Sequence, residues 1–369
     1  MSEEIASGIA GCELKVLPGG HFVHDEQPDL HFDTVQGFSH VIDRPLGSSI
    51  ASGTGARRVG SFCRIWSVFI HIILRRGIRM KLKNKVTIIT GAGTGIGEAI
   101  AHKFAREGAQ LVLAGLPSDP VQDVADAVAS RDVDAVVHLG DLAEEAEARA
   151  CVELAVERFG RIDVLVNNAG VFVASATTEL YRVEDFDRTV RNNLRTAFLM
   201  TKFALPHLQK TRGNILFTGS EAGLNGLAMF APYGGTKAFL HAFMKAVALE
   251  QAPYGIRANC VCPGAIDTAW TRGVASPIDP AAQEMLDDTI PLGRRGTPEE
   301  IANVFAFLAS DEASYVTGAL WLADGGASPA RGSLSTSMPA EIRRPPPGTL
   351  ALHHSHDGLR NKEVYKAPR

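Results

Sequence analysis

Short apolar runs alternate with amphipathic stretches between residues 81 and about 330. The apolar runs predict seven strands, over residues 85–90, 109–115, 135–140, 162–170, 213–220, 256–264 and 318–326. Helical spacing of apolar residues predicts helices over residues 95–108, 144–160, 186–208, 237–252 and 298–310. Strands separated by helices need crossover connections, so the pattern predicts an α/β fold with a doubly wound parallel sheet.

The first 79 residues lack this periodicity and are interpreted as a low-order N-terminal extension, or as upstream sequence before a domain that begins at Met80. Their apolar patch, residues 62–74, is interrupted by Arg64 and His71. It is shorter than the roughly 20 apolar residues that span a membrane. Basic residues without acidic ones suit a targeting segment, but acidic residues before position 44 argue against a transit peptide.

The far end, residues 331–369, is polar and rich in proline. Such a composition buries too little apolar area to offset the entropy lost on ordering, so we expect a disordered C-terminal tail. Its histidines, His353, His354 and His356, are expected to bind metal only adventitiously. Residues 80–330 therefore form the single predicted domain.

Composition narrows the class of protein further. Of 369 residues, 45% are hydrophobic and 21% charged, which is typical of a globular chain. A formal net charge of -4 gives no general attraction to nucleic acid or to anionic membranes. Five scattered cysteines indicate a reduced, cytoplasmic protein. Cys260 and Cys262 lack a third ligand nearby in the sequence, so no metal site is predicted.

The segment TGAGTGIG, residues 90–97, joins the first predicted strand to the first predicted helix. Glycines at 91, 95 and 97 permit a tight turn, the close approach of a pyrophosphate, and close packing of helix on sheet. Unpaired N–H groups and the positive end of the helix dipole favour an anion at this point. The segment therefore predicts a nucleotide-binding loop.

Tyr233 and Lys237 are four residues apart and share one face if their segment is helical. A phenol with a reference pKa of roughly 10 is a poor proton acceptor near neutrality. A neighbouring ammonium would favour the phenolate and lower the tyrosine pKa. The pair is therefore a candidate acid/base, although such pairs also occur on solvated helices.

Six further motifs follow the glycine loop: GDL at 140–142, NNAG at 167–170, NNL at 192–194, GSEAG at 219–223, YGGTK at 233–237 and PGAIDT at 263–268. Together with that loop they resemble the short-chain dehydrogenase/reductase family in order and spacing. The resemblance covers residues 81–330 and implies a Rossmann fold. It also implies that residues 80–330 are a dinucleotide-binding catalytic domain.

The resemblance implies a catalytic set of Asn193, Ser220, Tyr233 and Lys237. Tyr233 would exchange a proton with the substrate oxygen, Ser220 would polarise that oxygen, and Lys237 would also hold the nicotinamide ribose. Asn193 would hold a water of the proton relay, with Asn192 as the competing assignment. The hydride would come from the nicotinamide, because no side chain supplies one.

The resemblance also implies a cofactor site for NAD or NADP. Its residues are Gly91, Thr94, Gly95, Ile96, Gly97, Asp141, Leu142, Asn167, Ala169, Gly170, Tyr233, Lys237, Pro263, Ile266 and Thr268. Asp141 and Leu142 would lie near the adenine, and Ile266 and Thr268 near the nicotinamide amide. A purely structural role for Asn167 is the alternative.

The choice between NAD and NADP stays open at this stage. Gly115 stands where NAD users of the family often have an acidic residue. Thr94 and Leu116 stand where NADP users often have a basic one, and Ser118 suits either ribose. Neither expected signal is present.

Two function classes follow from the resemblance. The first is an oxidoreductase of secondary alcohols or ketones, such as 3-oxoacyl, sugar or polyol, cyclic or steroid-like compounds. The second is a catalytically silent cofactor sensor or scaffold of the same fold. Residues 269–292 would cover the substrate, and the helical segments 186–208 and 237–251 would pair subunits into a homodimer or homotetramer. No nucleic-acid or membrane partner is expected.

Overall fold

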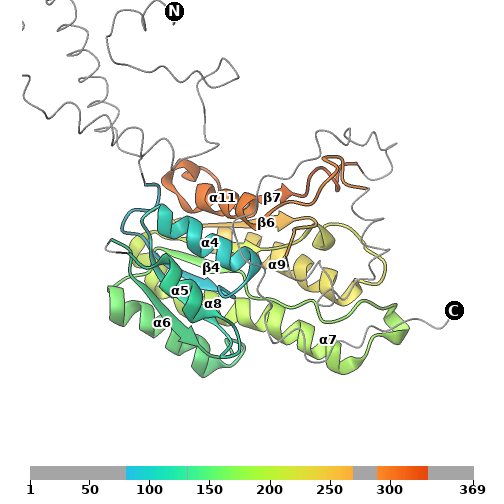
Figure 1. Cartoon of the computed structure of the whole chain (residues 1–369), viewed down its shortest axis with the longest axis horizontal. Coiled ribbons are helices and arrows are strands. Elements are labelled where there is room, and N and C mark those ends of the chain that lie inside the picture. The colour runs from blue at the N-terminus through green and yellow to red at the C-terminus, as the bar shows by residue number, and fades with distance from the viewer. Residues whose placement is uncertain (1–79, 131, 269–288, 331–369) are drawn as a thin grey trace, which may run out of the picture. The chain divides into compact units, whose positions relative to one another are not determined.

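The computed structural model describes residues 80–130, 132–268 and 289–330 (Figure 1). The chain divides into two units, Met1–Gly77 and Ile78–Arg369, and every described residue lies in the second. The expected extension and tail, and most of the loop expected over the substrate, therefore fall outside the described residues.

Seven parallel strands form one sheet in the order β3-β2-β1-β4-β5-β6-β7. They are β1 Val86–Thr90, β2 Gln110–Gly115, β3 Ala135–Leu139, β4 Val164–Asn167, β5 Asn214–Thr218, β6 Arg257–Pro263 and β7 Leu320–Ala323. All seven predicted strands are confirmed, as is the doubly wound Rossmann architecture. The strand order reverses between β1 and β4, so their carboxyl ends open a crevice where such sheets bind ligands.

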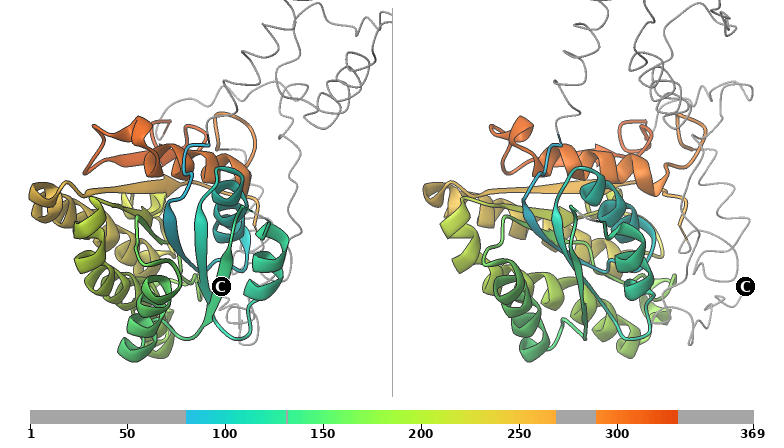
Figure 2. Two further views of the ribbon diagram at one scale, coloured as in Figure 1. Left: turned by 90° about the vertical axis from the view of Figure 1, so that its left-hand side faces the viewer. Right: turned by 60° about the vertical axis from the view of Figure 1, so that its left-hand side comes forward.

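Helices cover both faces of this sheet (Figure 2). One layer contains α4 Gly95–Arg106, α5 Val121–Val128 and α11 Pro298–Ala309, and the other contains α6 Glu145–Phe159, α8 Thr196–Thr211 and α9 Ala231–Gln251. A shorter helix, α7 Val183–Val190, precedes α8. Each layer shares its own hydrophobic core with the sheet, which explains why the central strands are apolar on both faces.

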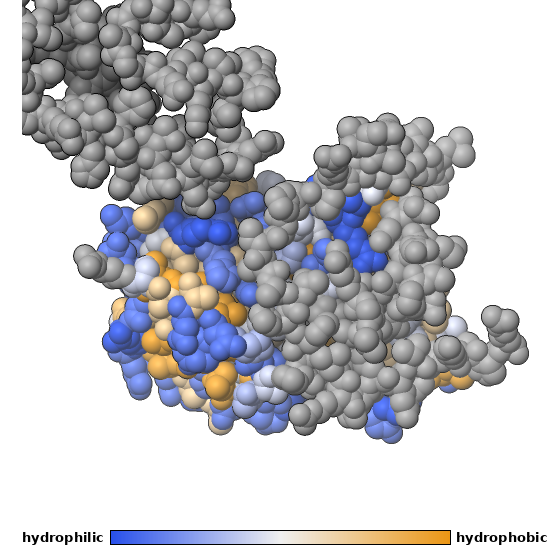
Figure 3. Space-filling model, viewed as in Figure 1, coloured by the Kyte–Doolittle hydropathy of each residue, from blue (hydrophilic) through white to orange (hydrophobic). Residues whose placement is uncertain are grey.

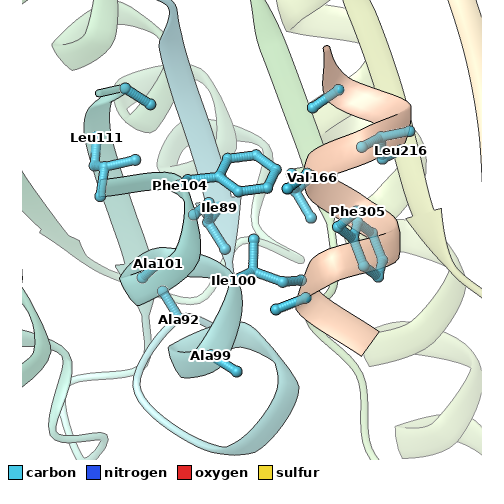
Figure 4. Packing of buried hydrophobic residues seen from close by; sticks show 14 of the residues in the cluster. Ile89, Ala92, Ala99, Ile100, Ala101, Phe104, Leu111, Val166, Leu216 and Phe305 are labelled. Atoms are coloured by element: carbon cyan, nitrogen blue, oxygen red, sulfur yellow. The ribbon is translucent and has the colours of Figure 1, made fainter. Parts of the chain in front are cut away.

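The packing of α4 shows how the first layer is held (Figure 4). Ile100 and Phe104 of α4 are fully buried with Ile89 of β1, Val166 of β4 and Phe305 of α11. Burying a side chain of this size stabilises the fold by about 1.5–3 kcal/mol. This core fixes the first turn of α4 against the carboxyl end of β1.

Two helical details differ from the sequence prediction. Helix α5, eight residues long, was not predicted; its pattern VQDVADAV is short and follows Pro120. The helix predicted over 186–208 is interrupted, because residues Arg191–Arg195 form a π-helix between α7 and α8. Hydrophobic spacing does not separate one i+5 turn from the i+4 turns that flank it.

Within the described part of the chain, none of the helices combines the length and apolar character that crossing a membrane requires. On the face drawn in Figure 3, hydrophobic and hydrophilic residues are interspersed over the described surface.

Candidate active site

The glycine loop between β1 and α4 has the geometry that a phosphate-binding turn needs. Gly91 and Gly95 have φ angles of 63° and 57°, which favour glycine. A Cβ on Gly97 would lie 2.0 Å from the Gly91 carbonyl oxygen, so this glycine permits the helix to pack on the loop. Thr94, the N-cap residue, makes no capping hydrogen bond with its side chain. The N–H groups of the first turn of α4 therefore suit the pyrophosphate of a dinucleotide.

Asn168 ties this loop to the centre of the sheet. Its Nδ2 donates to the carbonyl oxygens of Thr90 and Gly91, at 3.1 and 3.2 Å. Its Oδ1 accepts a 3.0 Å hydrogen bond from the Thr218 hydroxyl at the end of β5. The Thr90 hydroxyl accepts from the backbone N–H groups of Asn168 and Ala169. Asn168 was not among the predicted site residues, although it lies inside the NNAG motif.

The side chains of Ser220 and Tyr233 are neighbours, close enough for Ser220 to affect the pKa of the tyrosine. The Ser220 hydroxyl accepts a 3.1 Å hydrogen bond from the Ala222 N–H. Ser220 follows β5 and is buried, whereas Tyr233 lies in the first turn of α9 and is half-buried. Pro232 suits this turn because its fixed φ matches a helix start. The Phe172 ring lies 4.9 Å from the Tyr233 ring and 5.0 Å from that of Phe230. Two hydroxyls are thus fixed side by side at the carboxyl end of the sheet.

Lys237 lies one turn after Tyr233 on α9 and is almost fully buried. Its ammonium donates a 2.8 Å hydrogen bond to the carbonyl oxygen of Thr218. The same nitrogen lies 5.6 Å from the centre of the Tyr233 ring. Lys237 and Tyr233 are therefore neighbours on one helix face, as their spacing predicts.

The titration of this pair differs from the sequence expectation. Burial raises the pKa of Tyr233 to about 12, although the neighbouring Ser220 side chain acts in the opposite direction. Burial lowers the pKa of Lys237 to about 8. The pKa of Tyr233 is therefore raised and not lowered as expected, because burial has the largest effect on it and the Lys237 ammonium is not among the causes of the shift.

Asn193 lies in the π-helix and is 1% exposed. Its Oδ1 accepts from the Val171 N–H at 2.7 Å, and its Nδ2 donates to the Val171 carbonyl and to the Thr236 hydroxyl, both at 3.0 Å. A Cβ on Gly170 would lie 3.1 Å from Asn193 Oδ1 and 3.7 Å from Lys237 Nζ. Asn193 and Lys237 therefore both face Gly170.

Two predicted cofactor residues have other partners in the structure. Asp141 accepts a 2.6 Å hydrogen bond from Arg191 and a 3.0 Å bond from the Ala143 N–H. Asn167 is buried and donates to the Thr201 hydroxyl in α8 at 3.0 Å. The alternative of a structural role for Asn167 agrees with this contact. The adenine contacts of Asp141 and Leu142 stay predictions.

Residues after β6 reach across to the glycine loop. Pro263 ends β6, and Ile266 forms an isolated bridge with Gly296. The Thr268 Cγ2 lies 3.4 Å from where a Cβ on Gly95 would stand. Two loops far apart in the sequence therefore face each other at the crevice, as expected if both contact one cofactor.

Asp119 places a carboxylate beside Gly115, the position at which the sequence lacks the acidic residue expected of an NAD user. A Cβ on Gly115 would lie 3.5 Å from Asp119 Oδ2, and 2.6 Å from Val121 Cγ2, which leaves no space for a side chain at 115. The Leu116 N–H donates to the same carboxylate oxygen at 3.3 Å. Asp119 follows Gly97 by 22 residues. That separation matches the acidic residue that binds ribose about 20 residues after a glycine loop, a signal that was missed.

A third possible metal ligand lies close to Cys260 and Cys262, whereas none is near them in the sequence. His241 of α9 supplies a third donor, and its nitrogen and the two sulfurs lie within 4.8 Å of one another. The sequence analysis missed His241 because it precedes Cys260 by 19 residues.

A family model described as enoyl-(acyl carrier protein) reductase matches residues 91–328. The chain therefore belongs to the short-chain dehydrogenase/reductase family, as its motifs predict. It is an oxidoreductase of CH–OH groups that uses NAD or NADP.

Three similar proteins illustrate the match. Meso-2,3-butanediol dehydrogenase of Serratia marcescens is 40% identical over 253 residues, covering 69% of this chain and 98% of its own. L-fucose dehydrogenase of Bos taurus is 39% identical over 246 residues, covering 66% and 89%. The crystal structure of 3-ketoacyl-(acyl-carrier-protein) reductase from Brucella melitensis, complexed with NADH, is 34% identical with a TM-score of 0.61, covering 67% and 99%.

Proposed function

We propose that this protein interconverts secondary alcohols and ketones, with Tyr233 as the acid/base. The observation that carries the proposal is that the side chain of Ser220 is close enough to the Tyr233 hydroxyl to lower its pKa, with Lys237 one turn further along α9. Both hydroxyls can therefore reach one substrate oxygen. The nicotinamide supplies or accepts the hydride when it is bound.

In the direction of reduction, Ser220 and Tyr233 both act on the carbonyl oxygen of the substrate. Ser220 donates a hydrogen bond to the carbonyl oxygen and stabilises the negative charge that develops there. Tyr233 gives its proton to the same oxygen. Its raised pKa keeps it protonated near neutral pH, and this is the form that a proton donor needs.

Oxidation needs the reverse transfer, from the alcohol to Tyr233. We assign Lys237 and Asn193 to this half of the reaction, because both side chains face Gly170 and Lys237 lies beside the tyrosine. The ammonium stabilises a tyrosinate by its charge, and Asn193 orients a water that carries the proton away. The residues at positions 91, 94–97, 263, 266 and 268 are assigned to the cofactor.

The position of Asp119 favours NAD over NADP. Its carboxylate lies beside Gly115, at the carboxyl end of β2, where the hydroxyls of the adenosine ribose are expected. A carboxylate accepts hydrogen bonds from these hydroxyls and repels the additional phosphate of NADP. No basic side chain stands at Leu116 to offset that repulsion.

Among the candidate substrates we place polyols and sugars first. Two of the similar proteins are dehydrogenases named for a diol and a sugar. A 3-oxoacyl substrate is the second choice, since another similar protein is a 3-ketoacyl reductase. Cyclic and steroid-like alcohols complete the set of candidates.

A homodimer or homotetramer and a cytoplasmic location also stay proposals. The aromatic residues Phe198 of α8 and Phe239 of α9 are 46% and 40% exposed. Their rings lie near that of Phe243, with centroids 6.1 and 5.6 Å from its own; Phe239 is stacked on Phe243 and Phe198 is tilted against it. This aromatic surface supports pairing through α8 and α9. Light scattering on the full chain measures the resulting mass.

The test of the function is a screen of the full chain, following the absorbance of NADH and NADPH with ketones and of NAD and NADP with alcohols. Turnover with a diol, a sugar or a ketone supports the enzyme. Cofactor binding without turnover on every candidate class would favour the alternative, a catalytically silent sensor of the same fold.

A further inference from the structure

A cluster of three soft or borderline ligands lies on the inner side of α9. The Cys262 sulfur is 3.3 Å from His241 Nε2 and 4.0 Å from the Cys260 sulfur. The two cysteines are fully buried, and the histidine is 5% exposed. We refer to His241, Cys260 and Cys262 as the thiol–imidazole cluster.

The local sequence explains why these side chains meet. Cys260 and Cys262 are two residues apart in β6, so both point to the same face of the sheet. This face is covered by α9, where His241 lies one turn after Lys237. Gly219 makes the room: a Cβ there would be 2.5 Å from His241 Nε2 and 2.7 Å from the Cys260 sulfur.

The separations match those of a tetrahedral metal centre. Zinc binds sulfur at about 2.3 Å and imidazole nitrogen at about 2.0–2.1 Å, so tetrahedral angles place two sulfurs about 3.8 Å apart and a sulfur and a nitrogen about 3.5 Å apart. The observed 4.0 and 3.3 Å differ from these values by a few tenths of an ångström. The third pair is within 4.8 Å and needs a closer approach.

We propose that the thiol–imidazole cluster binds one thiophilic divalent cation of the zinc class. The cation takes the Cys260 and Cys262 sulfurs and His241 Nε2, and the two thiol protons pass to water. Thiolates together with imidazole select such metals over magnesium or calcium.

The ion is expected to be held less tightly than a structural zinc. The described residues provide three ligands, whereas structural zinc sites have four. His241 Nδ1 also has no hydrogen-bond partner among the described residues, so the outer hydrogen bond that usually orients a ligating histidine is missing. These features indicate an inhibitory or regulatory site and not a permanent one.

A metal ion bound to the thiol–imidazole cluster can affect the catalytic residues through α9. His241, Lys237 and Tyr233 are spaced by one turn each along α9. A metal ion pulls His241 toward β6 and so displaces the turn that carries Lys237. We therefore expect a bound ion to lower turnover, slowly, because all three ligands are buried.

Cadmium is the probe for the binding test, since its bonds to thiolates give an ultraviolet charge-transfer band. The parent protein of this test is the full chain with Cys12→Ser and Cys63→Ser. These two thiols lie outside the described residues and would add their own signal. We expect one Cd²⁺ per chain. Cys260→Ser and Cys262→Ser should each reduce the band by about half or more, and His241→Asn should weaken binding at least about tenfold.

Cys151→Ser is the matched control, because Cys151 is an equally buried thiol in α6. It should leave the band unchanged, and circular dichroism checks that every variant is folded. A parent protein without the band, or a band that persists in both Cys260→Ser and Cys262→Ser, overturns the site.

Activity after incubation with Cd²⁺ tests the link to α9, and this arm alone rests on the proposed function. Turnover should fall with time in the parent and in Cys151→Ser but not in Cys262→Ser. Equal inhibition of Cys262→Ser contradicts the link. An inactive parent would count against the proposed function, whereas the absorption band would still decide the metal site.

Discussion

Lys237 donates its hydrogen bond to the Thr218 carbonyl at 2.8 Å, while its nitrogen lies 5.6 Å from the centre of the Tyr233 ring. The lysine is therefore anchored to the end of β5, beside the tyrosine. A carbonyl acceptor fixes the ammonium without neutralising it, so its charge stays available to a bound ligand. Burial nevertheless has the largest effect on both residues: it raises the pKa of Tyr233 and lowers the pKa of Lys237. Both shifts favour the uncharged side chain.

Tyr233→Phe should lower kcat by about 10²–10⁴-fold, because general acid/base catalysis typically contributes that much. The phenyl ring keeps the contact with Phe172, so the dissociation constant of the cofactor should change by less than about threefold. Tyr181→Phe is the control: Tyr181 bonds Thr189 and belongs to no proposed catalytic group. A Tyr233→Phe enzyme with near-normal kcat would remove the tyrosine from the mechanism.

Lys237→Met should abolish turnover and yet stabilise the fold at neutral pH. The pKa of Lys237 is lowered from 10.5 to about 8 by burial, so the folded protein holds this proton less tightly than the unfolded chain does. Below about pH 8, burial of the charged ammonium lowers the free energy of unfolding by its full amount, about 1–3 kcal/mol. This destabilisation decreases between about pH 8 and 10.5, as the unfolded chain also loses the proton.

Urea unfolding of both proteins at pH 7 and pH 10 measures this difference. The free energy of unfolding should be higher for Lys237→Met at pH 7, and the gap should shrink at pH 10. Exposed Lys245→Met provides the comparison for a lysine on the outer side of α9. A variant that is less stable at pH 7 would show that the contacts of Lys237 outweigh its burial.

Glu98 in the first turn of α4 gives the opposite pH dependence. Burial raises its pKa from 4.5 to about 7, although a hydrogen bond from the Gly95 N–H acts against this, and Glu299 adds to it. Ionising the carboxyl therefore costs stability from about pH 4.5 upward, fully above about pH 7. Glu98→Gln should raise the free energy of unfolding at pH 8 by about 1–3 kcal/mol and leave it nearly unchanged at pH 4.5.

The measurement is urea unfolding of both proteins at pH 4.5, 6 and 8. Glu184→Gln, at an exposed position of α7, should show no such trend. If Glu98→Gln were equally stabilising at pH 4.5 and 8, ionisation would not be the cause of the effect.

The sheet and the main motifs could be predicted because their signals are local. Apolar runs such as VTIIT of β1 are buried on both faces, and the segment from Gly91 to Gly97 has to turn tightly between β1 and α4. Tyr233 and Lys237 are related by one helical turn, a distance that spacing alone supplies.

The rest depends on contacts between distant segments. His241 meets Cys260 and Cys262 only because α9 lies on β6, and Asn168 joins the ends of β1 and β5 through hydrogen bonds. The π-helix around Asn193 has the same hydrophobic spacing as the helices on either side. The rise in the Tyr233 pKa reflects burial by several segments, which a pair of sequence positions does not reveal.

Asp119 is expected to decide the choice of cofactor. Its carboxylate lies beside Gly115 at the end of β2, and it accepts from the Leu116 N–H at 3.3 Å. Asp119→Asn keeps an oxygen for that N–H but removes the charge, so the loop is preserved while the repulsion of a ribose phosphate is lost. The preference for NAD over NADP, measured as a ratio of dissociation constants, should fall at least about tenfold, or about 1.4 kcal/mol.

Calorimetric titration of the full chain gives both dissociation constants without requiring a substrate. Asp123→Asn, an exposed carboxylate at the start of α5, is the matched control and should keep the ratio within about twofold. Asp119→Ala separates charge from loop structure: if Ala weakens both cofactors equally while Asn changes neither, Asp119 only shapes the loop. A parent protein that binds NADP as tightly as NAD would contradict the assignment outright, since an ionised carboxylate at the ribose disfavours the phosphate.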